Sequence, residues 1–194
     1  MGRTPSASSE ARQRILETAD RLFYREGIRA VGIDRVIAEA DVAKATLYAH
    51  FPSKDDLIVA VLHHREESVL TFFRAAMERH GRRTKDRLSA FFAALKEWFQ
   101  SPDFRGCAFQ NAAAELADPK HPGSAVVREH KRRFRDMIDG LVEGVVGKAH
   151  ARLTPAVAIL VEGAVVTAVI HGSADAADVA RDATLALVAG AKGG

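Results

Sequence analysis

Hydrophobic residues recur every three or four positions along almost the whole chain, which is the spacing of an α-helix with one apolar face. In the first such stretch, Ile15, Ala19 and Leu22 share a face. No segment shows the sustained apolar and polar alternation of a half-buried strand. The pattern predicts an all-α fold of about nine helices, over residues 9–27, 33–39, 43–50, a long stretch after Ser53, a stretch from Thr84 past Phe99, 106–117, a long stretch after Gly123, 154–172 and 173–189.

The helices fall into two groups. Three of them occupy the first 50 residues and make a small unit, after which Ser53 and Asp56 form an arrangement like a capping box at the start of a long helix. A second core is indicated further on, because seven of the ten phenylalanines and Trp98 lie between residues 72 and 109. We expect a first domain over 1–54, with a disordered tail over about 1–8, and a second domain over 55–194.

Composition places the chain among globular proteins. Of its 194 residues 47% are hydrophobic and 27% charged, and the net charge of +3 permits nucleic acid binding without requiring it. Cys107 is the single cysteine, which excludes an internal disulfide framework and a zinc site built from several cysteines. Because no apolar run of signal-peptide length follows the first basic residues, we expect a cytoplasmic protein.

Residues 153–174 are apolar enough to raise the question of a membrane span. Their one formally charged side chain is Glu162. A carboxylate in the middle of a span costs about 2.5 kcal/mol or more, and the stretch is rich in alanine and glycine. We interpret it as a fully buried helix of a soluble protein, with a membrane span as the alternative.

The most informative segment is residues 33–51, which predicts two short helices that pack at a steep angle across a three-residue turn. Its apolar positions are Ile33, Val36, Ile37, Val42, Leu47 and Phe51. The second helix would then expose a set with one positive charge and no acid, which suits the major groove of DNA: Lys44, Ala45, Thr46, Tyr48, Ala49 and His50. Arg35 and Lys54 would reach the flanking phosphates. The alternative is a solvated helix pair within a larger bundle.

Residues 9–57 resemble the DNA-binding region of TetR-family transcriptional regulators. The resemblance is carried by the stretch 27–34, by the pair Ala38 and Ala40, by Val42-x-Lys44-x-Thr46-Leu47-Tyr48-x-His50-Phe51 and by Pro52-Ser53-Lys54. It implies that DNA is contacted by Lys44 and Thr46 and, mainly through phosphates, by Tyr48, His50 and Lys54.

The chain departs from the family pattern at several positions of this region. Val31, Gly32 and Ala43 stand where the family usually has hydroxyl residues, so possible helix caps are lost. Asp41 stands where the family has glycine, and Ala45 where it often has glycine. Asp41 must therefore take or avoid a left-handed turn conformation at some cost.

The remainder is similar to the family in layout, and residues 104–122 look like a stretch seen in one TetR subgroup. This resemblance implies a helical effector domain that dimerises through its last two helices. The segment 153–171 is apolar nearly all round, and small residues would let helices approach closely. We expect an interface containing Ala164, Val165, Ala168, His171, Ala183 and Ala186. The alternative is that these are core helices of a monomer.

Aromatic and polar residues of the second part could line an effector pocket. The candidates are Phe92, Trp98, Phe109, Asn111, Glu115, His130, Phe134, Met137 and Glu162. Each aromatic can equally be a core residue, and His130 and Glu162 can be satisfied within the core. Cys107 can be a redox sensor or a small buried hydrophobe. No metal, cofactor or catalytic motif is visible, so we predict no enzyme.

Together these features predict a ligand-responsive, DNA-binding transcriptional regulator, most often a repressor in the family it resembles. It would bind a pseudo-palindromic operator as a homodimer and be released by a small-molecule effector. The alternative is a helical small-molecule-binding or catalytic protein that does not bind DNA.

Overall fold

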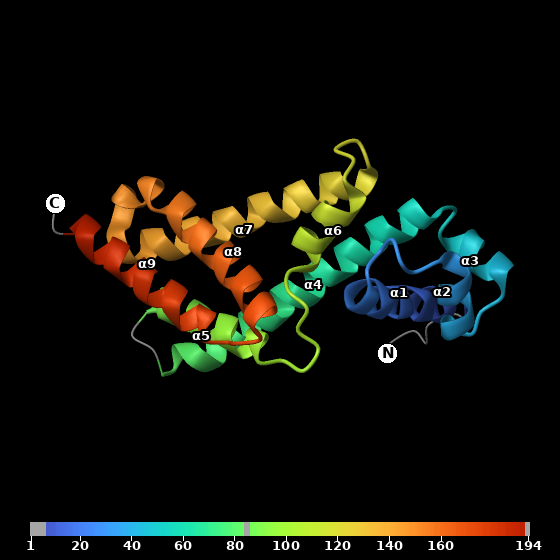
Figure 1. Ribbon diagram of the computed structural model, residues 1–194, viewed down its shortest axis with the longest axis horizontal. Helices are drawn as coiled ribbons and strands as arrows, with labels where there is room; N and C mark the ends of the chain where they lie inside the picture. The colour runs from blue at the N-terminus through green and yellow to red at the C-terminus, as the bar shows by residue number, and fades with distance from the viewer. Residues whose placement is uncertain (1–6, 84–85, 193–194) are drawn as a thin grey trace, which may run out of the picture. The chain divides into compact units, whose positions relative to one another are not determined.

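The computed structural model describes residues 7–83 and 86–192. These residues form nine α-helices and one short 3₁₀ segment, with no strand, so the expected all-α class is confirmed (Figure 1). The elements are α1 (Ala7–Glu26), α2 (Ile33–Ala40), α3 (Lys44–His50), α4 (Lys54–Gly81), α5 (Arg87–Phe99), α6 (Ala108–Leu116), α7 (Pro122–Val146), η1 (Gly147–Arg152), α8 (Thr154–His171) and α9 (Ala176–Lys192).

The helix ends differ from expectation by a few residues. α1 already includes positions 7 and 8 of the expected tail, while residues 1–6 lie outside the described part. Thr84 also lies outside it; α5 begins after Asp86, whose carboxylate accepts the Ser89 N–H over 2.7 Å. The 3₁₀ segment after α7 was not expected. α9 starts three residues later than predicted and continues to Lys192.

The chain divides into two compact units that do not coincide with two stretches of sequence. The first unit contains the residues up to Ser68 together with Ala108–Arg128, so it holds α1–α3, the first half of α4, α6 and the start of α7. The second contains Val69–Cys107 and the residues from Glu129 onward. These two units are defined by packing and not by binding. The division into a DNA-binding domain up to residue 54 and an effector-binding domain after it therefore stays a prediction.

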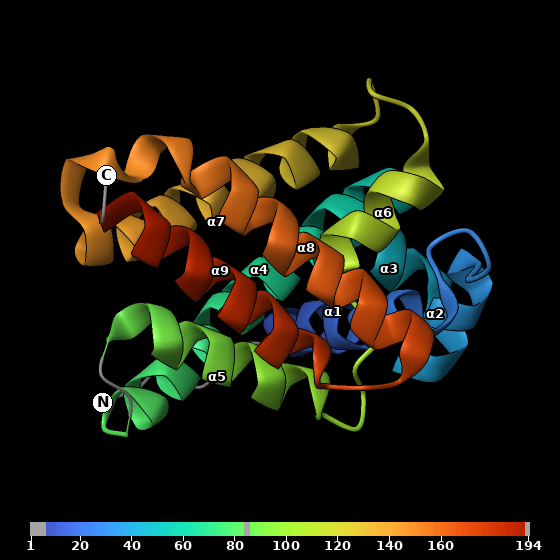
Figure 2. The same cartoon turned by 60° about the vertical axis from the view of Figure 1, so that its left-hand side comes forward.

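Each unit has its own apolar interior. In the first, the predicted face of α1 is fully buried at Ile15, Ala19 and Leu22. In the second, α9 lies between α5 and α8 (Figure 2), and the core contains phenylalanines of α4 and α5. Phe73 stacks on Phe91 at 5.7 Å between ring centres. The concentration of phenylalanines thus marks a core, as the sequence indicated.

Helix α8 is not fully buried in the chain, which corrects the sequence interpretation. One face lies in the core of the second unit, at Val157, Val161 and Ala168. The opposite face is exposed, with Ile159 72% and Ile170 70% accessible. Among the described residues α8 is the one helix long and apolar enough to cross a membrane by length and composition, which is weak evidence. Both faces of α8 are therefore apolar, although only one of them is buried in the second unit. This explains why the sequence of α8 has apolar residues nearly all round the helix.

Candidate nucleic-acid interface

Helices α2 and α3 form a tight pair in the first unit (Figure 1). Val36 and Leu47 are fully buried, and Phe51 nearly so, which fixes the two helices against α1. Asp41 ends α2 with φ of 50°, a left-handed conformation that is unfavourable for a residue other than glycine. The turn was therefore placed correctly, and Asp41 takes the strained conformation rather than avoiding it.

The departures from the family pattern have the expected effect on the helix ends. Gly32 precedes α2 and Ala43 precedes α3, and neither makes a side-chain capping hydrogen bond. Compared with a capping residue, alanine at this position costs about 1 kcal/mol of helix stability, whereas glycine costs only a few tenths. Both short helices therefore depend on their packed faces for stability.

The outer face of α3 presents the residues expected to contact DNA. Lys44, Ala45, Tyr48 and Ala49 are exposed, while Thr46 and His50 are half-buried. The Lys44 ammonium lies 3.3 Å from the Asp34 carboxylate, but both side chains are largely exposed. Such a pair is weak in water and is easily exchanged for a phosphate. The outer face of α3 thus presents one ammonium group, two alanine methyl groups and several side chains that can form hydrogen bonds. Proteins use groups of these kinds to recognise bases in the major groove of DNA.

Helix α1 also contributes to the surface around α3, and this was not predicted from the sequence. A shallow hollow beside α3 is lined by Ala45 and Ala49 and also by Arg14 of α1. Arg12, half a turn earlier, lies with its guanidinium 5.2 Å from the centre of the Phe51 ring. The basic residues at the start of α1 were visible in the sequence. Their position beside α3 follows only from the packing of α1 on α3.

Arg35 is already occupied by acids. It makes hydrogen bonds to both oxygens of Glu26 and to Glu39, and Glu39 also pairs with Arg21 at 2.7 Å. The hydrogen bonds that Arg35 donates to Glu26 and then to Glu39 raise the pKa of Arg35, while those donated by Arg21 and Arg35 lower the pKa of Glu39. A phosphate contact by Arg35 would require exchange of these partners, so that role stays a prediction.

Lys54 also has a partner within the first unit. Its Nζ donates to the Ile28 carbonyl over 2.6 Å and lies 5.9 Å from the centre of the Phe23 ring. Burial lowers the pKa of Lys54, and attraction to Glu115 and Asp55 opposes that effect. The expected phosphate contact by Lys54 would replace the Ile28 contact.

The candidate effector residues are divided between the two units. Phe109, Asn111 and Glu115 lie on α6 in the first unit, whereas the others belong to the second: Phe92, Trp98, His130, Phe134, Met137 and Glu162. Phe92 and Phe109 are almost completely buried. The structure therefore does not bring the nine residues together around one cavity within either unit.

In the second unit, the contacts of Lys131 were not predicted from the sequence. Lys131 lies 3.2 Å from the Glu162 carboxylate, 3.9 Å from the Cys107 sulfur and 5.7 Å from the centre of the Phe134 ring. Glu162 on its apolar helix thus has a cationic partner. The neighbouring His130 is buried, and burial followed by repulsion from Lys131 and Arg133 lowers its pKa to about 4.

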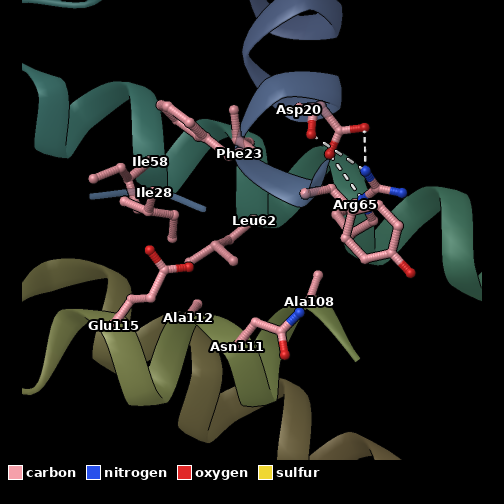
Figure 3. Close-up of a pocket in the computed structure, with 12 residues that line it drawn as sticks. Asp20, Phe23, Ile28, Ile58, Leu62, Arg65, Ala108, Asn111, Ala112 and Glu115 are labelled. Carbon is pink, nitrogen blue, oxygen red and sulfur yellow. Dashed lines mark hydrogen bonds and ion pairs between the residues drawn. The ribbon is translucent and has the colours of Figure 1, made fainter. Parts of the chain in front are cut away.

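Two of the three candidate residues of α6, Asn111 and Glu115, line a small pocket in the first unit that faces α1 and α4 (Figure 3). Asn111 and Glu115 project from α6 toward Ile28 and Leu62. On the opposite wall Arg65 pairs with Asp20 at 2.7 Å and covers the Tyr24 ring at 4.3 Å. Burial raises the pKa of Asp20, and Arg65 partly offsets this.

The expected interface residues are of two kinds. Ala164, Val165 and Ala168 are at most 6% exposed and belong to the core of the second unit, and their contact with a second copy stays a prediction. His171, Ala183 and Ala186 are at least partly accessible and stay predicted interface residues. The exposed apolar positions of α8 and α9 that sequence reasoning missed are Ile159, Val166, Val169, Ile170, Val179 and Leu187. Because both faces of α8 are apolar, the sequence did not indicate which of its side chains are exposed.

Within residues 7–83 and 86–192, no group of three or more His, Cys, Asp or Glu side chains is arranged to hold a metal ion. None of the described residues near α3 therefore belongs to a group that could bind a metal ion. The expectation that the protein needs no metal, no cofactor and no catalytic residue stays a prediction.

Comparison with known proteins gives matches to two family models. Residues 15–61 match the model of the bacterial regulatory proteins of the tetR family, and residues 84–184 match the tetracyclin repressor-like C-terminal domain. Curated HTH-type transcriptional regulators of Staphylococcus aureus strains are 36% identical over 67 residues, which is 34% of this chain and 36% of theirs. The chain thus aligns with about a third of the length of these relatives.

Solved structures extend the likeness over the whole chain. A TetR-family transcriptional regulator from Streptomyces coelicolor is 34% identical, with a TM-score of 0.83 over 95% of this chain and 97% of that one. A TetR-family regulator from Cytophaga hutchinsonii shares the fold at 16% identity, with a TM-score of 0.79 over 97% and 98% of the two chains. With a helix-turn-helix that presents α3 and a matching C-terminal model over half of its length, the chain belongs to the TetR family of DNA-binding transcriptional regulators.

Proposed function

We propose that the protein is a repressor that binds a pseudo-palindromic operator as a homodimer and is released by a small-molecule effector. The observation that carries this proposal is the outer face of α3, where Lys44, Ala45 and Tyr48 are exposed without an acid on the same helix. Arg14 adds a second cation beside that face. In this function Lys44 and Thr46 read base edges, while Tyr48, His50 and Lys54 hold phosphates.

The dimer is supported by the uncovered apolar face of α8 and α9. Exposed side chains of this size on two adjacent helices are unfavourable in water. A second copy that covers them would form a four-helix interface with two-fold symmetry. Two copies of α3 would then enter successive major grooves about one helical turn apart, which is why the operator should be a pseudo-palindrome.

Release by an effector requires a ligand that binds the DNA-free arrangement more tightly than the DNA-bound one. Reciprocity then requires DNA to weaken effector binding by the same factor. The candidate contacts in the second unit are the polar pair Lys131 and Glu162 and the aromatic residue Phe134 beside it. We place the protein in the cytoplasm, where operator DNA is found, and assign it no catalytic activity.

Selection of bound fragments from random duplex DNA, with and without candidate small molecules, tests this function. We expect recovery of a two-fold related motif whose retention falls when an effector is present. Recovery of no enriched motif would contradict the proposal and favour a helical small-molecule-binding protein that does not act on DNA.

A further inference from the structure

One peptide group in the connector between α1 and α2 is held at both of its polar ends. The Lys54 ammonium, at the start of α4, donates to the Ile28 carbonyl over 2.6 Å. The N–H of Arg29 belongs to the same peptide group and donates to Glu115 Oε2 of α6 over 2.9 Å. A cation and an anion from two helices therefore hold the connector that leads into α2.

Gly27 makes room for this arrangement. It has φ of +96°, which L side chains rarely adopt, and a Cβ there would lie 3.0 Å from Glu115 Oε2. The positive φ therefore favours glycine at this position, and a Cβ would push the Glu115 carboxylate away slightly. Three separate features, at Gly27, Lys54 and Glu115, converge on one peptide group.

The inward position of Lys54 has an electrostatic cost that Glu115 offsets. Burial in the first unit removes water from the ammonium and lowers the pKa of Lys54. Attraction to Glu115 and then to Asp55 acts in the opposite direction. Since the Ile28 carbonyl is neutral, the carboxylate of Glu115 supplies the main charge that favours this position.

A DNA phosphate would offer the same ammonium a charged acceptor, and charge-assisted hydrogen bonds are about twice as strong as neutral ones. We propose that Lys54 is shared between two acceptors, the Ile28 carbonyl and a DNA phosphate, and that Glu115 is a positioning residue that favours the first. The inference rests on the proposed function. By holding Lys54 inward, Glu115 makes α6 a determinant of operator affinity.

The test uses the full-length protein and a duplex that the wild type selects from random DNA. Dissociation constants are measured at several salt concentrations for the wild type, Glu115→Gln, Lys54→Met and the double variant. Glutamine keeps an oxygen that can accept the Arg29 N–H but removes the charge. Glu115→Gln should tighten binding about fivefold, the low end of typical coupling between sites. It should have no effect when Lys54 is already methionine.

The salt dependence gives an independent readout. Lys54→Met should reduce the slope of log affinity against log salt by about one unit, as expected for one lost phosphate contact. Glu78→Gln, which removes the same charge from an exposed position in the second unit, should leave the selected-site affinity unchanged. This control separates a change in net charge from a change at Lys54.

Two results would overturn the inference while leaving the proposed function intact. Weaker or unchanged binding by Glu115→Gln would mean that its carboxylate does not compete with DNA for Lys54. An equal gain in the Lys54→Met background would mean that the effect does not pass through Lys54. Failure of the wild type to bind any duplex would instead overturn the proposed function, and the inference with it.

Discussion

Single residues decide whether distant segments of this chain can meet. Gly27 is the clearest case, because its positive φ and missing Cβ admit the Glu115 carboxylate from a helix almost 90 residues later in sequence. Asp41 also has a positive φ, and for this residue, unlike glycine, the conformation is unfavourable. The segment that includes α2 therefore has a positive-φ residue near each end, and of these two Asp41 is the strained one.

Replacement of Gly27 by alanine should destabilise the protein by about 1–2 kcal/mol, because an L residue is strained at positive φ. Its Cβ would also press on Glu115. Urea unfolding followed by circular dichroism measures the change. Gly140→Ala is the matched control: position 140 has open space in the middle of α7, so alanine should stabilise there by about 0.5–1 kcal/mol. Equal effects at the two positions would contradict the role given to Gly27.

His130 should make the stability of the protein depend on pH. Its pKa of about 4 in the folded state lies below the ordinary value of 6.5, so the unfolded chain binds the proton more readily. The stabilising contribution is present above pH 6.5 and is lost as the pH falls from 6.5 toward 4. Between pH 7.5 and pH 5 the loss should be about 2 kcal/mol.

Urea titrations of the wild type and His130→Gln at both pH values measure this term. The difference in unfolding free energy between pH 7.5 and pH 5 should be smaller in the variant, since glutamine does not titrate. The same pH dependence in both proteins would show that other groups cause it.

Among the helices, α2 and α3 were predictable because their signals are local. Val36, Leu47 and Phe51 recur at helical spacing around a three-residue turn, and all three are buried. The location of α6 was not predictable, since its contact with the connector joins Arg29 and Glu115 across 86 positions. Composition and periodicity carry no information about such pairs.

The same limit explains the candidate sites. Exposure of Lys44 and Tyr48 followed from the periodicity of α3, whereas the acids around Arg35 lie on two different helices. For α8, periodicity could not separate the two faces because both are apolar. Only the packed structure shows that Ala168 faces the core and Ile170 faces outward.

Two substitutions on α8 test the assignment of its faces. Ile170→Lys changes the exposed face and should give a folded monomer if that face holds the dimer together. Ala168→Arg, two residues away, buries an unpaired guanidinium in the core and should lower the melting temperature sharply. Light scattering gives the mass and circular dichroism the helix content. A wild type that is already monomeric at micromolar concentration would refute the dimer.

In the whole molecule, the proposed function involves the outer face of α3, Lys54 at the start of α4 and the exposed apolar face of α8 and α9. Each is defined within its own unit. A regulator of this kind needs the two units to influence each other, and α4 and α7 both run from one unit into the other. The common requirement of every part of the account is that α3 contacts DNA.

The most direct measurement of that claim is a binding titration on the selected duplex and on a scrambled duplex, at several salt concentrations, for the wild type and Lys44→Ala. Lys120→Ala, at an exposed lysine of the first unit, controls for the lost charge. The account predicts that Lys44→Ala costs about 1–3 kcal/mol on the selected duplex and reduces the preference for it over the scrambled one. Lys120→Ala should leave both quantities unchanged. Unchanged affinity and preference in Lys44→Ala would contradict the assignment of α3 as the recognition helix.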